Sequence, residues 1–501
     1  MSPIRLPSVG APYVSWSRLR SSTTRETILI AAAVAAFAAL LVASIGYAAD
    51  TPMIAFVPLG LLGGVLACWI IAAAYAGSPA AIMAYFAAFT FITDAQFRVR
   101  GAGDIDADWQ SLLKFGLWIG AGAIGAGHLP PLGRMLSRPG PALWLAYIGI
   151  ALLSSLYSPV PGYSFGCAFT LLCFIAFAYA LITRLSESQI FWTFVLTLTV
   201  FNAISWVVFY VDPELGTSAA WTTGGMMYRM CGIAGQATNL GEVCAKYIGA
   251  AFLLWWAGRC RLFLAVIFMA FGTVTLVASD CRTMIISVVV GIAAVVASRS
   301  VWLLAGGVLA ALAGLAVFLL VPHLADALGA HFSRSGDATE LYTLTGRLEI
   351  WDFVWQQIME KPILGWGYNS SKVVLGQHFG FANGLMVDSA HNLFLQSLLS
   401  VGFIGTLPLV GVLLLLGARL LLRPPPLVAY FSIIVMIGAV SDTSAVGTTP
   451  TLMTLLFLMV SIWPTSAEVR RASIPAWRPP WPATGSFPSA AALSLPRARG
   501  R

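Results

Sequence analysis

Charged residues are scarce in this sequence. They make up 10% of its 501 positions, whereas hydrophobic residues make up 59%. Soluble domains carry about 25% charged residues, so this chain has too few to cover the roughly three soluble domains that its length would otherwise form. The composition therefore excludes soluble, disordered and fibrous proteins and indicates a protein that is solvated by lipid.

Lysine and paired cysteines are also lacking. Only four of the 28 basic residues are lysines, and many arginines lie in tails and short loops between apolar runs, as the positive-inside rule predicts for a membrane protein. The seven cysteines have no paired spacing, which favours buried, unpaired side chains. Cys231 and Cys281 fall in predicted outer loops and are the two that could form a disulfide bond.

Apolar runs of the length that crosses a bilayer recur along the whole chain. They span residues 27–49, 53–76, 79–93, 110–127, 141–158, 163–183, 190–211, 241–257, 262–278, 283–298, 301–321, 393–422, 427–441 and 447–463. Because two of these runs are short, the sequence predicts an all-α integral membrane protein, a polytopic helical bundle of about 12–14 transmembrane helices.

The arginines predict the orientation of this bundle. The N-terminal tail, 1–26, holds four arginines and should therefore be cytoplasmic. Counted from there, every basic turn falls on the same side; these turns contain Arg134, Arg138, Arg184, Arg259, Arg261, Arg299, Arg419 and Arg423. The C-terminal tail, 464–501, is rich in proline, serine, alanine and arginine, and we expect it to be disordered and cytoplasmic.

Polar chemistry is concentrated on the opposite, extracytoplasmic face. A long segment, 322–392, separates a transmembrane bundle at 27–321 from C-terminal transmembrane helices at 393–463, and loops of this length are usually functional. It holds four of the five histidines, namely His323, His331, His378 and His391. They lack the His-x-x-x-His or cysteine-rich spacing of zinc sites, so we expect neither a metal nor another cofactor.

Short helices are expected within this long loop. Residues 347–358 place apolar side chains at the spacing of an amphipathic helix, which Lys361 and the proline after it should end. Residues 365–369 are expected to form a flexible turn. Ser389 is a good N-cap for the next apolar run, which would place His391 in the first turn of a membrane helix. The helix dipole and partial burial both disfavour an imidazolium there, and a neutral histidine is a competent general base.

Two further groups leave alternatives open. An acidic cluster on the outer side could bind a divalent cation or could be a solvated loop beside Arg98; it consists of Asp104, Asp106 and Asp108. Lys246 lies inside a predicted span, where a charge is usually functional. It is also close enough to the boundary to snorkel to the surface.

Several motifs near the long loop can be read together. The loop contains Gly-Arg-x-x-x-Trp from Gly346, then Pro-x-x-Gly-x-Gly from Pro362, then His-Asn-x-x-Leu from His391, with glycines following at 402 and 405. Weaker matches are residues 235–241, a Gly-x-x-x-Asn-x-Gly loop, and 279–283, a Ser-Arg-Thr turn with an insertion before the arginine. As a set these motifs, over residues 229–422, resemble the O-antigen ligase superfamily.

The resemblance implies a glycosyltransferase with a GT-C-like bundle in the bacterial inner membrane and an active site on the periplasmic face. It implies a donor glycan on undecaprenyl diphosphate, a glycan or lipid A–core acceptor, and an inverting reaction without a metal. His391 would be the base, while Arg347 and Arg282 would stabilise the diphosphate leaving group, since arginine is permanently charged and matches phosphate geometry. Further contacts to diphosphate or glycan would come from Arg229, Asn239, Asn392 and Trp351.

One segment of the sequence bears on the subtype of glycosyltransferase. Residues 337–347 look more like an exopolysaccharide polymerase, which extends repeat units, than like a ligase that attaches finished O-antigen to lipid A–core. A transporter or flippase of lipid-linked sugars is an alternative, and it predicts inverted repeats, broken helices and charges within spans. A non-catalytic assembly scaffold is the other alternative, and it would tolerate loss of His391 and Arg347.

Overall fold

A computed structural model describes residues 57–98, 104–222, 225–298, 347–378, 387–422 and 424–464, together with positions 306 and 309. Each apolar run predicted within these ranges contains a helix, although the last one, 447–463, is helical only over 452–462. The runs at 27–49 and 301–321, the N-terminal tail and residues 465–501 lie outside the described residues, as do His323 and His331.

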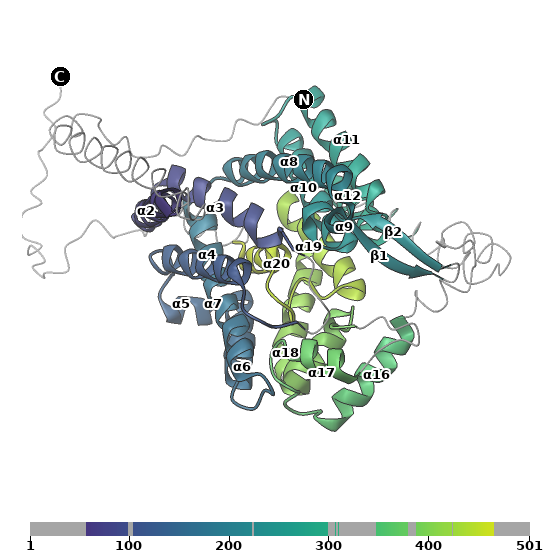
Figure 1. Ribbon diagram of the computed structural model, residues 1–501. Coiled ribbons are helices and arrows are strands. Elements are labelled where there is room, and N and C mark those ends of the chain that lie inside the picture. The colour runs from purple at the N-terminus through teal and green to yellow at the C-terminus, as the bar shows by residue number, and fades with distance from the viewer. Residues whose placement is uncertain are drawn as a thin grey trace, which may run out of the picture.

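The first half of the described chain is a series of helices followed by a hairpin (Figure 1). Its elements are α2 (Val57–Tyr75), α3 (Pro79–Asp94), α4 (Trp109–Ala126), α5 (Leu132–Leu136), α6 (Pro139–Ser154), α7 (Pro161–Arg184), α8 (Glu187–Val211), α9 (Pro213–Gly216), β1 (Thr217–Thr222) and β2 (Gly225–Met230). The second half comprises η3 (Gly232–Ala234), α10 (Ala237–Trp256), α11 (Leu262–Ala278), α12 (Arg282–Ala297), α16 (Arg347–Glu360), α17 (Ser371–His378), α18 (Leu393–Leu421), α19 (Pro426–Ser441) and α20 (Leu452–Ile462).

The helices confirm the predicted fold class, an all-α membrane protein. By length and composition alone, α7, α8 and α18 are long and apolar enough to cross a membrane, and shorter apolar helices such as α3, α6, α11, α12 and α19 accompany them. The antiparallel hairpin of β1 and β2 was not predicted. It projects from the side of the bundle in Figure 1.

Helix starts follow local sequence signals. Ser186 caps α8 in a reciprocal capping box with Gln189, and Ser78 caps α3 just before Pro79. The Asp108 carboxylate caps α4 by accepting a hydrogen bond from the Ser111 amide at 2.8 Å. These caps satisfy backbone donors that would otherwise be unpaired at the ends of helices.

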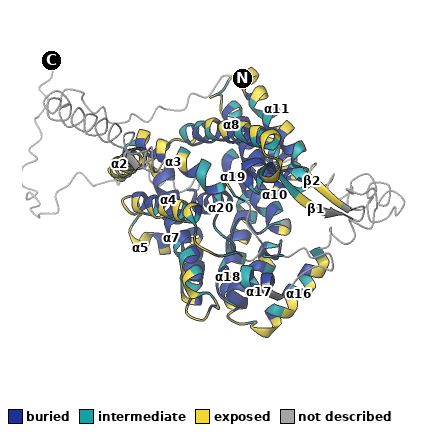
Figure 2. Cartoon of the chain, in the orientation of Figure 1, coloured by how far each residue is buried: buried dark blue, intermediate teal, exposed yellow. Residues whose placement is uncertain are grey.

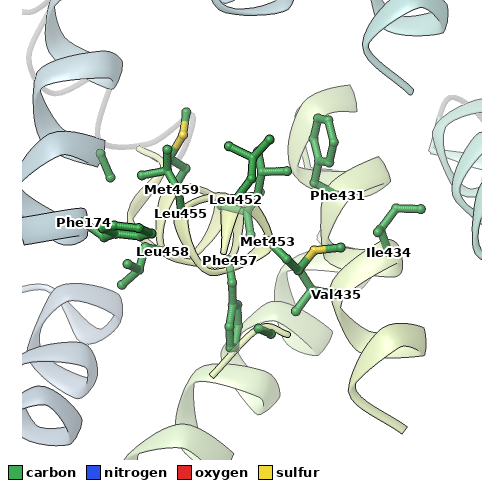
Figure 3. Packing of buried hydrophobic residues seen from close by; sticks show 14 of the residues in the cluster. Phe174, Phe431, Ile434, Val435, Leu452, Met453, Leu455, Phe457, Leu458 and Met459 are labelled. Atoms are coloured by element: carbon green, nitrogen blue, oxygen red, sulfur yellow. The ribbon is translucent and has the colours of Figure 1, made fainter. Parts of the chain in front are cut away.

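The shortest of the C-terminal helices, α20, lies at the centre of the molecule. All eleven of its residues are buried, and it contacts α3, α6, α7, α18 and α19. Figure 3 shows its apolar side chains between Phe174 of α7 on one side and Phe431, Ile434 and Val435 of α19 on the other. Eleven residues rise only about 16 Å, so α20 is a core helix that depends on its neighbours for burial.

Two arginines hold the C-terminal end of α20. Arg138 donates to the Ile462 carbonyl at 3.3 Å, and Arg419 donates to the Val460 carbonyl at 2.9 Å. Cations stabilise the carbonyl end of a helix. Both arginines belong to the turns that the sequence predicts to be cytoplasmic, so this end of α20 gathers basic residues from distant parts of the chain.

Helix α18 is broken at Gly402, and a segment of the long loop fills the break. Gly402 has non-helical torsion angles (φ 65°, ψ −172°). The Trp366 and Gly367 amides donate to the carbonyls of Leu399 and Ser400 at 2.8 Å each, and the Phe403 amide donates to the Pro362 carbonyl at 2.8 Å. Residues 365–369 were expected to be a flexible turn, but this segment is largely buried and hydrogen-bonded into the break.

A second, smaller core lies beside the bundle. Helix α16 confirms the predicted amphipathic helix, ends at Glu360 just before Lys361 as expected, and buries Ile350, Val354 and Ile358. These pack with Leu375 of α17, Val387, Ala390 and Leu399 of α18. The first part of α18 and the loop helices therefore form one packed unit next to His391.

All seven cysteines are free, so the disulfide considered for Cys231 and Cys281 does not form. Both thiols are buried. The start of α10 packs closely on Cys281, since a Cβ placed on Gly241 would lie 2.4 Å from the Cys281 Cβ. This close packing joins α10 to the turn between α11 and α12.

Candidate active site

A polar cavity of about 160 Å³ lies where several helices begin or end. Its lining residues come from the end of α3, the start of α4, the start of α10, the start of α17, the loop before α18, and the irregular segment between α19 and α20. They are Thr93, Asp94, Gln96, Lys114, Gln236, Asn239, Glu242, Lys372, Asp388, Ser389, His391, Asp442, Thr443, Ser444, Thr448, Thr449, Pro450 and Thr451. The cavity is at the opposite end of α20 from Arg138 and Arg419.

His391 lies in the cavity wall in an uncommon backbone conformation. Its φ is 46°, in the left-handed region that few non-glycine residues adopt. The N-cap of α18 is Asn392 rather than Ser389: the Asn392 side-chain oxygen accepts from the amides of Phe394 and Leu395 at 3.0 and 3.2 Å. His391 therefore precedes the helix instead of lying in its first turn, and its position depends on the loop.

Two side chains hold this loop in place. The Trp351 indole donates to the Ala390 carbonyl at 3.0 Å, and the Gln396 side chain accepts from the Ala390 amide at 2.9 Å. On the other side, the Asn392 amide group donates to the Val440 carbonyl of α19 at 3.1 Å. The residues on either side of His391 are thus fixed to α16, α18 and α19.

The charges around His391 shift its pKa in opposite directions. Burial lowers the pKa of His391, and the positive charge of Arg347 lowers it further, while Asp442 and Asp388 raise it. Because the net direction is down, His391 is neutral at ordinary pH and can accept a proton. This agrees with the neutral state that the sequence predicted, and burial is the largest cause.

Glu242 and Asp442 form an acidic part of the cavity wall. Glu242 is buried at the start of α10 and accepts a hydrogen bond from the Ser444 hydroxyl. Asp442 follows α19, and its own oxygen accepts from the Thr443 amide at 2.6 Å. Both acids fix the irregular segment 442–451, so they shape the cavity as well as charging it.

A buried ion pair connects the cavity wall to the interior of the bundle. The Lys246 ammonium is 2.8 Å from one Asp94 oxygen, and the two side chains are 1% and 6% exposed. The other Asp94 oxygen accepts from the Leu452 amide at 2.9 Å, at the start of α20. Lys246 therefore does not snorkel to the surface; it neutralises the carboxylate that anchors the central helix.

Of the other predicted site residues, only Asn239 is part of the cavity wall. Asn239 lines the cavity and donates to the Ala234 carbonyl at 3.3 Å. Arg347 begins α16, and Arg282 begins α12, where its guanidinium is 3.3 Å from the Asp280 carboxylate. Arg229 lies in β2 opposite Ser218, close enough to act electrostatically on Cys281, the residue before Arg282.

The sequence reasoning did not single out four cavity residues, Asp94, Glu242, Asp442 and Lys372. Three of them are acids at or just inside the ends of predicted spans. An ionisable residue in such a position is a functional candidate by default, and this signal, applied to acids as it was to Lys246, would have found them. His378 ends α17, and the position of its side chain is not described.

In the acidic cluster of Asp104, Asp106 and Asp108, neighbouring groups of the protein already bind the carboxylates of Asp104 and Asp108. Arg98 lies 2.5 Å from the Asp108 carboxylate and 3.5 Å from that of Asp104, and Asp104 also accepts from the Asp106 amide at 2.9 Å. Asp108 in addition caps α4. These contacts support the solvated, structural alternative for this loop.

Comparison with known families bears directly on this cavity. Residues 264–410, which include His391, Arg347 and Arg282, match the family model described as O-antigen ligase. The chain contains an O-antigen ligase domain. No curated protein matches the chain. An O-antigen ligase domain implies a glycosyl-transfer type of reaction at a membrane, with a lipid-linked glycan and an acceptor as its substrates in general.

The matched region also covers residues whose contacts hold the fold together. Trp351 and Asn392 lie in it, as do Pro362, Gly365, Gly367 and Gly402, which form the filled break of α18. Asp94, Glu242 and Asp442 lie outside it. The cavity is therefore completed by helices on both sides of the matched region.

Proposed function

We propose that this protein transfers a glycan from undecaprenyl diphosphate to a sugar hydroxyl on the periplasmic face of the bacterial inner membrane, polymerising the repeat units of an exopolysaccharide or O-antigen. The observation that carries the proposal is the position of His391, a neutral base in the wall of a polar cavity, with Arg347 acting on it and the matched O-antigen ligase domain around it.

In this mechanism the acceptor oxygen attacks the anomeric carbon of the donor sugar. The bond from that carbon to the diphosphate breaks, and the acceptor proton passes to the His391 imidazole. Negative charge grows on the departing diphosphate, and Arg347 and Arg282 stabilise it, with Arg229 nearby. Direct displacement inverts the anomeric configuration, and these residues supply the needed charge and base without a metal.

The acceptor sugar would occupy the cavity. Hydroxyl groups, side-chain amides and carboxylates line it, and these pair with sugar hydroxyls in either direction. Its 160 Å³ is small beside the roughly 300–1,000 Å³ of typical ligand pockets, so it suits one terminal sugar unit. Asn239 and Glu242 would bind that unit opposite His391.

The transporter alternative predicted charges within spans and a broken helix, and the structure contains both. Each is satisfied inside the protein, however: Lys246 pairs with Asp94, and residues 362–367 fill the break of α18 by backbone hydrogen bonds. Transporters leave such groups facing a substrate path at the midplane. The satisfied groups favour a structural role here, and the transfer assay discriminates between the two functions.

The test uses a deletion strain complemented with wild type, His391→Ala or Arg347→Ala at matched membrane levels. The control is Gln356→Ala, which alters an exposed residue of α16. Loss of a general base costs roughly 10²–10⁴-fold in rate, so we expect both site variants to lose long-chain glycan and accumulate glycan on undecaprenyl diphosphate. Stranded single repeats would indicate a polymerase, and stranded finished chains would indicate a ligase. Normal glycan in both variants would falsify the proposed site.

A further inference from the structure

Helix α16 has an apolar surface wider than the part that packs on the protein. Its inner face buries Ile350, Val354 and Ile358. The next stripe around the helix consists of Leu348, Trp355 and Met359, at the spacing of one helical face. It remains exposed, and Figure 2 shows exposed positions along α16.

This exposed stripe continues past the end of the helix. Ile363 and Leu364 follow α16, and together with the three stripe residues they are 45–61% exposed. Polar residues occupy the next sector of the helix, where Glu349, Asp352, Gln356 and Glu360 are all exposed. A helix that combines a wide apolar sector with a charged sector suits the plane of a lipid–water interface.

The apolar stripe joins the lipid-facing side of the bundle. The Phe403 and Ile404 amides of α18 donate to the carbonyls of Pro362 and Ile363, and the Tyr157 hydroxyl donates to the Leu364 carbonyl at 2.7 Å. Next to these contacts, α18 exposes Phe403, Ile404 and Leu407. One apolar surface therefore runs from α18 through residues 363–364 onto α16.

The length of α18 after Gly402 sets the depth of this junction in the bilayer. Residues 403–421 are helical and rise about 28 Å, close to the roughly 30 Å of a bilayer's hydrocarbon core. The break at Gly402 then lies near one hydrocarbon boundary. Since residues 362–364 bond to the backbone there, α16 begins its contact with lipid at that boundary.

We propose that α16 lies in the surface of the bilayer on the cavity side, with Leu348, Trp355, Met359, Ile363 and Leu364 in the lipid and its acidic face in water. Its first residue, Arg347, acts electrostatically on His391. The helix thus places one end at the candidate active site and its flank in the leaflet. The inference concerns the membrane and does not rest on the transfer reaction.

The test uses full-length protein in liposomes of phosphatidylethanolamine and phosphatidylglycerol. Single cysteines are introduced as Met359→Cys and Leu348→Cys on the apolar stripe, with Gln356→Cys and Glu360→Cys as controls on the polar face. The background carries Cys68→Ser and Cys260→Ser, because the other native cysteines are buried. Each site receives a bimane label, and each protein is checked for a single symmetric peak by size exclusion.

We expect blue-shifted bimane emission at the stripe positions and loss of that emission to a shallow doxyl-labelled lipid more than to a deep one. The control positions should instead lose emission to aqueous iodide. Iodide quenching at all four positions would overturn the proposal, because α16 would then face water. Protection of positions 348 and 359 from both quenchers would also overturn it, because protein would then cover the stripe.

Discussion

At the scale of single residues, the site depends on how neighbouring charges set the protonation of His391. Asp442 and Asp388 favour the imidazolium, whereas Arg347 and burial disfavour it. In the transfer that we propose, the neutral form is the one that can take the proton of the acceptor. The lowered pKa of His391 would therefore keep the proposed base available in mildly acidic surroundings, where an ordinary histidine with a pKa of about 6.5 would already be half protonated.

This balance predicts opposite shifts in the pH profile for two variants. In Asp442→Asn the pKa of His391 should fall further, so the acid limb of kcat/KM should move to lower pH than in wild type. In Arg347→Gln the pKa should rise, and the acid limb should move to higher pH, along with a loss of rate. The measurement is the pH dependence of glycan transfer by purified protein. Equal profiles in all three proteins would show that His391 does not limit the acid limb.

Residues that the sequence motifs singled out lie both inside and outside the cavity wall. His391 and Asn239 line the cavity, whereas Arg347 and Arg282, from the same set of motifs, do not, and the roles of all four stay predictions. The cap was placed at Ser389, but Asn392 takes that role, and its side chain also reaches Val440 of α19. Asparagine is as good an N-cap as serine, so local propensity allowed both positions, and the contact with α19 accompanies the one that the structure has.

At the scale of elements, the junction of α18 with residues 362–367 explains two glycine positions. A Cβ on Gly402 would lie 2.2 Å from the Ile363 carbonyl oxygen, and a Cβ on Gly365 would lie 2.6 Å from the Gly402 amide nitrogen. Both residues also have positive φ, which costs other residues about 1–2 kcal/mol. The two backbones can approach only because neither position carries a side chain.

Gly402→Ala should therefore destabilise the protein, by about 2 kcal/mol or more when the clash is added to the backbone cost. Gly149→Ala in α6 is the matched control, since nothing lies within 4 Å of its Cβ position and alanine favours a helix by roughly 0.5–1 kcal/mol. The measurement is the midpoint of thermal unfolding in detergent. We expect a lower midpoint for the first variant and an unchanged or higher one for the second; equal midpoints would contradict the packing at the break.

Sequence patterns predicted the apolar helices well but not the segments that join them. Helices follow hydrophobic runs, and α16 follows its amphipathic spacing. The last predicted run, 447–463, is helical only over α20, and residues 447–451 belong to an irregular segment of turns and bends before it. Asp94, Glu242 and the α20 amides hold that segment in place, so its conformation is set by partners far along the chain.

At the scale of the whole molecule, the structure separates two chemically different ends. Arginines from distant turns, Arg138 and Arg419, meet at the C-terminal end of α20. Acids, His391 and hydroxyl groups meet at its N-terminal end. The sequence predicts the first group to be cytoplasmic and the second extracytoplasmic, and the structure has the two groups at opposite ends of α20; the orientation in the membrane stays a prediction.

Cysteine labelling of intact cells would test this orientation. Ala107→Cys, in the exposed loop before α4, should react with a membrane-impermeant maleimide. Ser137→Cys, exposed beside Arg138, should react only after the cells are opened. The background again replaces Cys68 and Cys260. The reverse pattern would place the cavity in the cytoplasm, and labelling of both sites in intact cells would show that the one predicted span between them, 110–127, does not separate them across the membrane.

The short central helix also bears on how the protein is made. The cavity draws on residues from Thr93 to Thr451, and α20 is the last described helix. With eleven residues, α20 falls well below the roughly 20 that insert into a bilayer unaided. During synthesis it must enter beside helices that are already in place, and until then Asp94 lacks the Leu452 amide. The cavity is thus completed only after residue 451 and α20 have been made, and a ribosome that stalls before codon 452 leaves the preceding helices without the complete site that we propose.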